Sequence, residues 1–355
     1  MNHKGDKIKM NNFKKSSDTR NNPVFKSITL AIALVIISAF VISISGCKPT
    51  LQRYEKNLEK MGTYVNIIIY ADKDKDSQKI LDLGFAKIDE LSKIASNYDK
   101  ESSVTKLNNE GLIENAPAEL VEIIQLSKDY YKTTMGAFDI TVDPILTLWS
   151  EGLWKESKEI QQDKILQALN FVGSDKITIE GSTIKFEKEG MSVTLGGVAK
   201  GYIVDKVIET LKSQGINNAL VNAGGDIATL GSKPDGGLWN VSLENPDNTS
   251  EKIVEFALAG KSIATSGNYY RYFDPKKEAA HIIDPRTGYT ADKCISATVI
   301  AQNATIADIL ATSVFVLGPQ DGISLVDSLE NVEAFIIDTE RNIFKSKGID
   351  KYILK

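Results

Sequence analysis

The residues best suited to chemistry fall into four clusters in the C-terminal half of the chain. The first is a glycine turn, Gly196–Gly201, which precedes a strongly predicted helix. Exposed backbone amides and a helix N-terminus together favour a phosphate. The turn lacks both the Gly-x-Gly-x-x-Gly of dinucleotide folds and the Gly-Lys-Ser/Thr ending of a P-loop. Glycines that only permit close packing of a helix on a sheet are an equal alternative.

The second cluster is another glycine turn, Asn222–Asp226, which follows the next predicted strand. Two glycine turns that are one β-α unit apart can meet at the same edge of a sheet. The carboxylate of Asp226 also suits a purely local role, in which it accepts hydrogen bonds from the backbone of its own turn. Both interpretations stay open at this point.

The third cluster, His281–Gly288, combines a histidine, an acid and an arginine in a Pro/Gly turn. A neutral imidazole near a carboxylate such as Asp284 can accept a proton from a hydroxyl, and Arg286 can face phosphate oxygens. A single histidine is more often structural than catalytic. Turns of this composition, however, place polar groups at the ends of strands, where sites are often built.

The fourth cluster lies on a predicted helix, Ala304–Leu317, where Asp308 and Thr312 are four residues apart and share one face. Oxygen ligands at this spacing suit a hard cation. Mg²⁺ typically takes one or two carboxylates and completes its octahedron with waters and phosphate oxygens. The alternative is a threonine bonded to its own helix backbone beside a solvated aspartate.

Hydrophobic periodicity predicts an α+β protein in which these clusters follow strands or lie at helix ends. A strand at Thr63–Ala71 and a helix at Asp76–Ala95 open the pattern. Further helices are predicted at Glu119–Thr133, Gln161–Phe171, Lys200–Gln214 and Ala304–Leu317. Further strands are predicted at Lys176–Ile179, Thr183–Phe186, Ser192–Leu195, Asn218–Val221, Trp239–Leu243, Ile253–Leu258, His281–Ile283, Ile295–Ala301 and Glu333–Ile337. We expect one large domain, because no linker or repeat interrupts the pattern.

Composition excludes several classes of protein. The 355 residues are 42% hydrophobic and 25% charged, which excludes a polytopic membrane protein and a disordered chain. A net charge of -5 leaves no basic field strong enough to favour nucleic acid as a partner. Two cysteines and two histidines cannot form a disulfide framework or a multi-histidine metal site. We expect Cys294 to be a buried strand residue.

The N-terminus has the features of an export signal. An apolar run, Ile28–Ile44, follows several basic residues and is short for a transmembrane helix. The next residues, Ile44–Cys47, resemble a bacterial lipobox, which implies cleavage before Cys47 and lipidation of its thiol. We therefore expect a signal peptide at 1–46 and a domain at 47–355 anchored to the extracytoplasmic face of the cell membrane. An uncleaved signal anchor would give the same sidedness.

Eight blocks along the chain together resemble the ApbE family, the FAD:protein FMN transferases. They are Met61–Thr63, Ser96–Asp99 with Ser103, Gly136–Val142 with Pro144, Leu195–Tyr202, Val221–Asp226, Ala264–Tyr269, His281–Gly288 and Ala307–Thr312. The chain departs from the family pattern after Tyr98, at Asp99–Val104, where family members commonly have a more leucine-like ending. Lys200, next to a proposed metal ligand, could meet either a phosphate or an acid.

The resemblance implies an α+β catalytic domain that splits Mg²⁺-bound FAD at its pyrophosphate and releases AMP. FMN is then esterified to a threonine or serine hydroxyl of a partner flavoprotein, for which an exported FMN-binding electron-transfer domain is the candidate. The implied metal ligands are Asp308, Thr312 and the backbone oxygen of Ala199. The implied flavin or adenine contacts are Met61, Tyr98, Ala137, Phe138, Asp139, Gly196, Tyr202 and Ile282.

We predict that His281 accepts the proton of the acceptor hydroxyl and that Asp284 orients it or balances its charge. Two related functions remain as alternatives: a FAD-binding electron-transfer lipoprotein, and a Mg²⁺-dependent FAD pyrophosphatase that yields FMN and AMP. A solute-binding lipoprotein of a transporter is a more distant alternative. That class usually has two similar lobes, and the sequence has no such duplication.

Overall fold

The structure, a computed structural model, describes residues 51–354 except 247, 269–271 and 275–278. The predicted signal peptide at 1–46 and the predicted lipidation site Cys47 therefore lie outside the described residues, as does Tyr269 of the sixth block. None of the helices in the described part is long and apolar enough to span a membrane.

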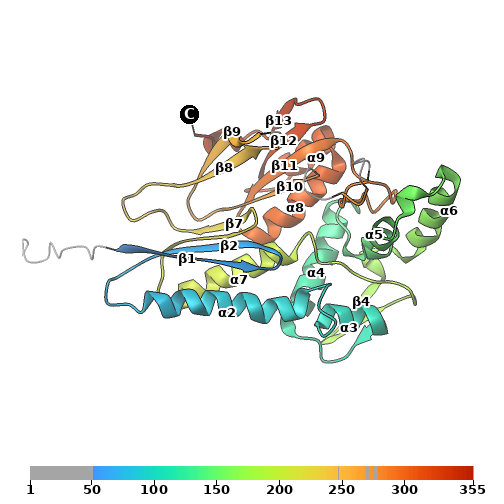
Figure 1. Ribbon diagram of the computed structural model, residues 1–355, viewed down its shortest axis with the longest axis horizontal. Coiled ribbons are helices and arrows are strands. Elements are labelled where there is room, and N and C mark those ends of the chain that lie inside the picture. The colour runs from blue at the N-terminus through green and yellow to red at the C-terminus, as the bar shows by residue number, and fades with distance from the viewer. Residues whose placement is uncertain (1–50, 247, 269–271, 275–278, 355) are drawn as a thin grey trace, which may run out of the picture. The chain divides into compact units, whose positions relative to one another are not determined.

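An eight-stranded antiparallel sheet carries the fold (Figure 1). Its strands alternate apolar side chains between two covered faces, as period-2 patterning requires. A two-residue turn, Met61-Gly62, joins the first two strands with φ angles of 54° and 67°, the left-handed values that a tight hairpin needs. In spatial order the strands are β1 (Gln52–Lys60), β2 (Thr63–Ala71), β6 (Asn218–Ala223), β7 (Asp226–Leu230), β10 (Ser262–Gly267), β11 (Cys294–Ala301), β12 (Glu333–Asp338) and β13 (Ile343–Lys345).

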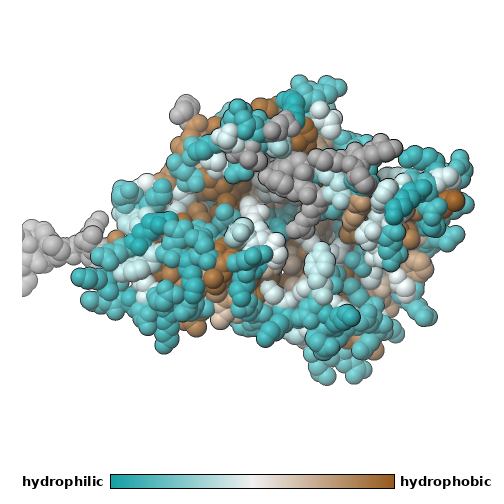
Figure 2. All heavy atoms as spheres, in the orientation of Figure 1, coloured by the Kyte–Doolittle hydropathy of each residue, from teal (hydrophilic) through white to brown (hydrophobic). Residues whose placement is uncertain are grey.

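Four helices cover one face of this sheet: α2 (Ser77–Ala95), α7 (Ala199–Ser213), α8 (Ala304–Leu317) and α9 (Pro319–Asp327). Val65, Ile67 and Ile69 of β2 point into the core beneath α2 and α7 and are fully buried. The outer surfaces of α2 and α3 (Ser103–Glu110) are mostly hydrophilic (Figure 2), as expected for amphipathic helices with one buried face.

The opposite face is covered by a hairpin of β8 (Trp239–Asn245) and β9 (Asn248–Leu258). A third group of elements connects the halves of the chain. It comprises α3 (Ser103–Glu110), α4 (Ala118–Thr133), α5 (Asp143–Ser150), α6 (Lys158–Ala168) and a small sheet of β3 (Leu112–Ile113), β5 (Thr183–Phe186) and β4 (Ile177–Glu180). This mixture confirms the predicted α+β class.

Two predicted strands are wrong. Ser192–Leu195 pairs with no strand, because side-chain amides take the place of a neighbour: Asn97 and Asn108 both donate to the Val193 carbonyl at 2.8 Å. His281–Ile283 lies in a loop whose one bridge joins Ile283 to Thr290. The buried position of Cys294 at the start of β11 is confirmed.

Candidate active site

The first two clusters of the sequence analysis meet α8 at the N-terminal end of α7. Here the two helices touch backbone to backbone: a Cβ atom on Gly201 would lie 2.3 Å from the carbonyl oxygen of Ala304 and 2.9 Å from Cβ of Asp308. The Gly201 amide donates a hydrogen bond to Oδ2 of Asp308 at 3.1 Å. Glycine is required at this position by close helix packing, and the same packing places a carboxylate against the glycine turn.

Asp308 is a buried carboxylate with an unfavourable environment for its charge. Its exposed fraction is 4%. Burial raises the pKa of Asp308 to about 7, and the negative charge of Asp226 also raises it, while Lys200 and the Gly201 amide act in the opposite direction. A cation bound at this carboxylate would offset the cost of its burial.

The second glycine turn supplies an ion pair beside Asp308. Lys200, the second residue of α7, pairs with Asp226, whose side chain is 3% exposed. Within its own turn, Asn222 accepts a hydrogen bond from the Gly225 amide at 2.9 Å. The local turn contact is thus made by Asn222, and Asp226 instead bonds across to α7. Of the two interpretations that the sequence left open, the structure shows the one in which the glycine turns meet.

Thr312 lies one turn after Asp308 on α8 and faces the same glycine turn. Its Oγ1 is 3.2 Å from Oγ of Ser266 on β10, and a Cβ atom on Gly197 would lie 3.0 Å from it. The ring of Phe138 borders the same glycine, 3.3 Å from that Cβ position. Glycine at 197 therefore leaves room beside the Thr312 hydroxyl.

The oxygen atoms gathered here suit a hard cation. In the part of the chain that the structure describes, no three His, Cys, Asp or Glu side chains converge on a possible metal position. One carboxylate, one hydroxyl and a backbone carbonyl are a set that Mg²⁺ accepts when waters and phosphate oxygens complete its shell. Ala199 is the first residue of α7, and a carbonyl oxygen has a second lone pair beyond its helix bond. The residues present therefore fit the ion.

The third cluster is a loop positioned by α5 and α6. Trp149 of α5 donates to the Gly288 carbonyl at 2.9 Å, and Ile283 shares an apolar core with both helices. His281 is partly buried at the start of this loop. Asp284 receives two hydrogen bonds of 2.8 Å from the guanidinium of Arg286. Its carboxylate is thus engaged within its own turn, and its suggested action on His281 stays a prediction.

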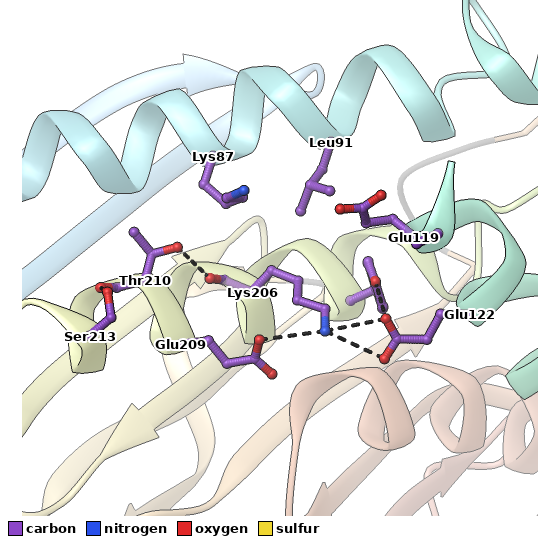
Figure 3. A pocket seen from close by; sticks show the side chains of 10 residues that line it. Lys87, Leu91, Glu119, Glu122, Lys206, Glu209, Thr210 and Ser213 are labelled. Carbon is purple, nitrogen blue, oxygen red and sulfur yellow. Dashed lines mark hydrogen bonds and ion pairs between the residues drawn. The ribbon is translucent and has the colours of Figure 1, made fainter. Parts of the chain in front are cut away.

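Tyr202 lies on a different face of α7 from Gly201. Its hydroxyl donates to Glu122 of α4 at 2.5 Å, and burial together with Glu122 raises the pKa of Tyr202. Both residues line a groove of about 390 Å³ between α2, α4 and α7. Figure 3 shows Lys206 and Glu122 pointing toward one another in this groove.

Among the other predicted flavin contacts, Ala137 and Ile282 belong to the apolar core beneath α8. Asp139 is 5% exposed, and it accepts hydrogen bonds from Thr141 and Ser174, both at 2.6 Å. This bonding fixes the loop that carries Ala137 and Phe138. Burial raises the pKa of Asp139, although these hydrogen bonds lower it.

The remaining predicted contacts lie at the edges of the site. Gly196 is exposed in the turn before α7. The Met61 hairpin adjoins the second glycine turn, because the Gly224 amide donates to the Tyr64 carbonyl at 3.2 Å. Tyr98 is 92% exposed, and its neighbour Asn97 bonds the segment that leads into the first glycine turn. An aromatic ring exposed at this point is available for stacking.

Comparison with known proteins shows the family to which the fold belongs. The family model described as the ApbE family matches residues 61–336. The chain belongs to the ApbE family. Both the candidate metal ligands and the loop of His281 lie within the matched part, and the chain is accordingly a transferase.

Relatives of the ApbE family extend the match over most of the chain. A FAD:protein FMN transferase of Haemophilus influenzae is 30% identical over an alignment of 340 residues that covers 89% of this chain and 95% of that one. The ApbE protein of Thermotoga maritima superposes with a TM-score of 0.77 at 28% identity, covering 86% of this chain and all of that one. The flavin transferase ApbE of Vibrio cholerae gives a TM-score of 0.74 at 26% identity, covering 85% and 99%.

Three residues of the site had no role in the sequence analysis. Ser266 lies on β10, a strand that the periodicity did not predict. Asp205 and Glu122 bond between helices, to α8 and α7 respectively. Asp205 follows Gly201 by four residues and therefore shares its helix face, which was the one available signal. Nothing in the sequence pairs Glu122 with Tyr202.

Proposed function

We propose that this ApbE-family chain transfers FMN from FAD to a serine or threonine hydroxyl of a partner flavoprotein, requires Mg²⁺ and releases AMP. One phosphoanhydride bond of FAD breaks and one phosphoester bond forms. The names of the curated relatives support FMN transfer to protein. The observation that carries the magnesium requirement is the buried carboxylate of Asp308, held against the glycine turn beside Thr312.

Each part of the site has a task in this reaction. Asp308, Thr312 and the Ala199 carbonyl would hold Mg²⁺, which when bound neutralises charge on the pyrophosphate. The amides of the glycine turn and the N-terminus of α7 bind phosphate oxygens. Lys200 adds a positive charge at the same helix end, where Asp226 fixes its direction. The buried apolar side chains of Ala137, Phe138 and Ile282 exclude water beside α8.

The acceptor hydroxyl must lose a proton as it attacks. We assign this proton to a ring nitrogen of His281, a group whose ordinary pKa lies near neutral pH. The loop that carries His281 is fixed by α5 and α6 rather than by a strand. Asp284 and Arg286, bonded to each other, keep the next turn of this loop in shape.

We further propose that the chain is exported and anchored by a lipid on Cys47 at the extracytoplasmic face of the cell membrane. The lipobox-like residues Ile44–Cys47 support this. The acceptor is then an FMN-binding domain of an exported or membrane electron-transfer flavoprotein. Substituting Cys47→Ala and following the protein between membrane and soluble fractions tests the anchor, because the variant should leave the membrane or remain as uncleaved precursor.

The decisive experiment mixes the chain from Lys48 onward with FAD, Mg²⁺ and a purified FMN-binding domain. The intact mass of the acceptor should increase by one FMN phosphoester, and chelation of Mg²⁺ should abolish the gain. AMP and free FMN without a change of acceptor mass would indicate the pyrophosphatase reaction. Unchanged FAD across a panel of acceptor domains would contradict the proposal and favour a FAD-binding protein.

A further inference from the structure

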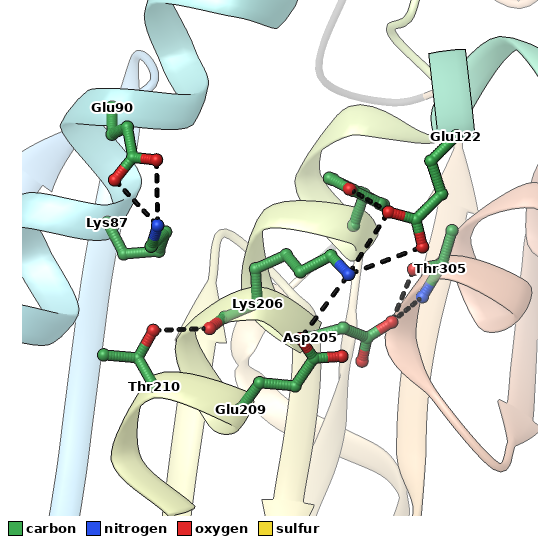
Figure 4. Close-up of polar contacts among 9 residues, drawn as sticks. Lys87, Glu90, Glu122, Asp205, Lys206, Glu209, Thr210 and Thr305 are labelled. Carbon is green, nitrogen blue, oxygen red and sulfur yellow. Dashed lines mark hydrogen bonds and ion pairs between the residues drawn. The ribbon is translucent and has the colours of Figure 1, made fainter. Parts of the chain in front are cut away.

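The start of α8 is bonded to α7 by a carboxylate that has no part in the proposed chemistry. Asp205 of α7 accepts hydrogen bonds from the backbone amides of Ala304 and Thr305, both at 2.8 Å, and from the Thr305 hydroxyl at 2.5 Å. Figure 4 shows Asp205 directed toward Thr305, while the neighbouring Lys206 points toward Glu122. Asp205 thus satisfies two of the four amides that a helix N-terminus leaves without a partner.

The other amides of that first turn are satisfied by α8's own cap. Asn303 accepts from the Ile306 amide through its side chain at 2.9 Å and from the Ala307 amide through its carbonyl at 3.2 Å. Asn303 therefore stabilises α8 as a helix, whereas Asp205 attaches the same turn to a second helix. Removal of Asn303 would affect the cap of α8, whereas removal of Asp205 would affect the attachment of α8 to α7.

The position of α8 along α7 decides the geometry of the candidate metal ligands. Ala199 lies on α7, whereas Asp308 and Thr312 lie on α8, one and two turns after Ala304. Asp205 is one turn after Gly201, where the helices touch. The Gly201 contact limits how closely the helices approach, and the directional bonds of Asp205 oppose sliding or rotation of α8 about that contact.

We propose that Asp205 is a positioning residue that sets the affinity for Mg²⁺ by fixing α8 against α7. The inference rests on the proposed function only for the identity of the ion. Metal ligands must be held within about 0.5 Å of their productive geometry, and outer partners that orient them typically affect metal affinity by about 10- to 100-fold. If α8 were less firmly held, part of the free energy of metal binding would be lost to ordering Asp308 and Thr312, and the Kd would rise.

The test compares Asp205→Asn with Asn303→Ala in the full chain, purified in detergent and free of FAD. The Kd for Mg²⁺ is measured by calorimetry, with Mn²⁺ and its electron paramagnetic resonance signal as a second probe, and unfolding temperatures are recorded alongside. We expect Asp205→Asn to raise the Kd roughly 10-fold or more. Asn303→Ala should lower the unfolding temperature about as much as Asp205→Asn does. It should leave the Kd within about twofold of the wild-type value.

Two results would overturn the proposal: a wild-type Kd in Asp205→Asn, or an equal increase in both variants, which would indicate loss of helix stability alone. If Asp205→Asn does not fold, Asp205→Glu replaces it, because it keeps the charge and displaces the carboxylate by one methylene. A raised Kd in Asp205→Glu supports positioning, and a wild-type Kd contradicts it.

A transfer assay separates this inference from the function on which it rests. At saturating Mg²⁺, Asp205→Asn should recover most of the wild-type kcat, because its defect is in metal affinity. If wild-type protein binds Mg²⁺ but transfers no FMN, the proposed function fails while the comparison of Kd values stands. If wild-type protein binds neither Mg²⁺ nor Mn²⁺, the metal site fails and this inference with it.

Discussion

Replacing Gly201 with alanine tests the backbone contact on which the candidate site is built. The new Cβ would lie 2.3 Å from the oxygen and 2.7 Å from the carbon of the Ala304 carbonyl. Both are backbone atoms and cannot rotate away as a side chain does. Because carbon contacts are favourable near 3.5 to 4.0 Å, α7 and α8 must separate by about 1 Å.

Two opposing effects decide the change in stability. Glycine to alanine inside a helix gains about 1 kcal/mol of helix propensity. Overpacking costs about 1 to 3 kcal/mol, and the upper value applies here because backbone must move. We therefore expect Gly201→Ala to lower the free energy of unfolding by about 2 kcal/mol. The separation should also break the 3.1 Å bond from the Gly201 amide to Asp308 and weaken Mg²⁺ binding.

Urea unfolding of metal-free Gly201→Ala measures the change in the free energy of unfolding. A Mg²⁺ titration of the same variant measures the change in affinity for the ion. Gly84→Ala in α2 is a matched control, because its Cβ would meet side-chain ends and no backbone: Ile67 at 3.0 Å, Val207 at 3.4 Å and Leu211 at 3.8 Å. This control should stay within about 1 kcal/mol of wild type, since a side-chain tip can shift. A Gly201→Ala variant that is more stable than wild type would refute the tight contact.

The remaining predictions concern the chemistry of the site. Asp308→Asn should reduce Mg²⁺-dependent transfer roughly 100-fold while the metal-free protein stays folded, because the amide keeps the shape of the buried carboxylate without its charge; unchanged transfer would disprove the metal assignment. His281→Ala should bind FAD normally but transfer FMN roughly 100-fold more slowly at pH 7, and normal transfer would remove His281 from the mechanism. Metal-free wild type should lose stability relative to Asp308→Asn as pH rises from 4 to 8, because folded Asp308 keeps its proton up to a pKa of about 7 whereas the unfolded carboxyl releases it near 3.8. A constant difference between the two proteins in denaturant titrations across that range would show that the pKa of Asp308 is not raised.

The local pattern of apolar residues was sufficient to predict the longer helices and strands. The strand at Thr63–Ala71 is confirmed at its predicted bounds, and the helices at 200–214 and 304–317 are each confirmed to within one residue. Their apolar residues repeat with the period of the structure they form. The short strands β7, β10 and β13 and the charged edge strand β1 were missed, because neighbouring strands rather than their own residues stabilise them.

The two wrong strands have a common cause. Ser192–Leu195 and His281–Ile283 have apolar residues typical of strands, but their backbone groups are satisfied by side chains or by a turn. Hydrogen bonds from distant side chains leave no trace in the local sequence. The approach of Asn108 to Val193, 85 residues away, is an example.

The sequence by itself determined the α+β class, the four chemical clusters and their likeness to one family, because residue types, periodicity and spacing are local properties. The tertiary structure alone decided which clusters meet. It pairs Lys200 with Asp226 and Tyr202 with Glu122, and it buries Asp308 at a helix crossing that only Gly201 permits. These outcomes depend on how helices pack on a shared sheet, and charge, burial and pKa at the site follow from that packing.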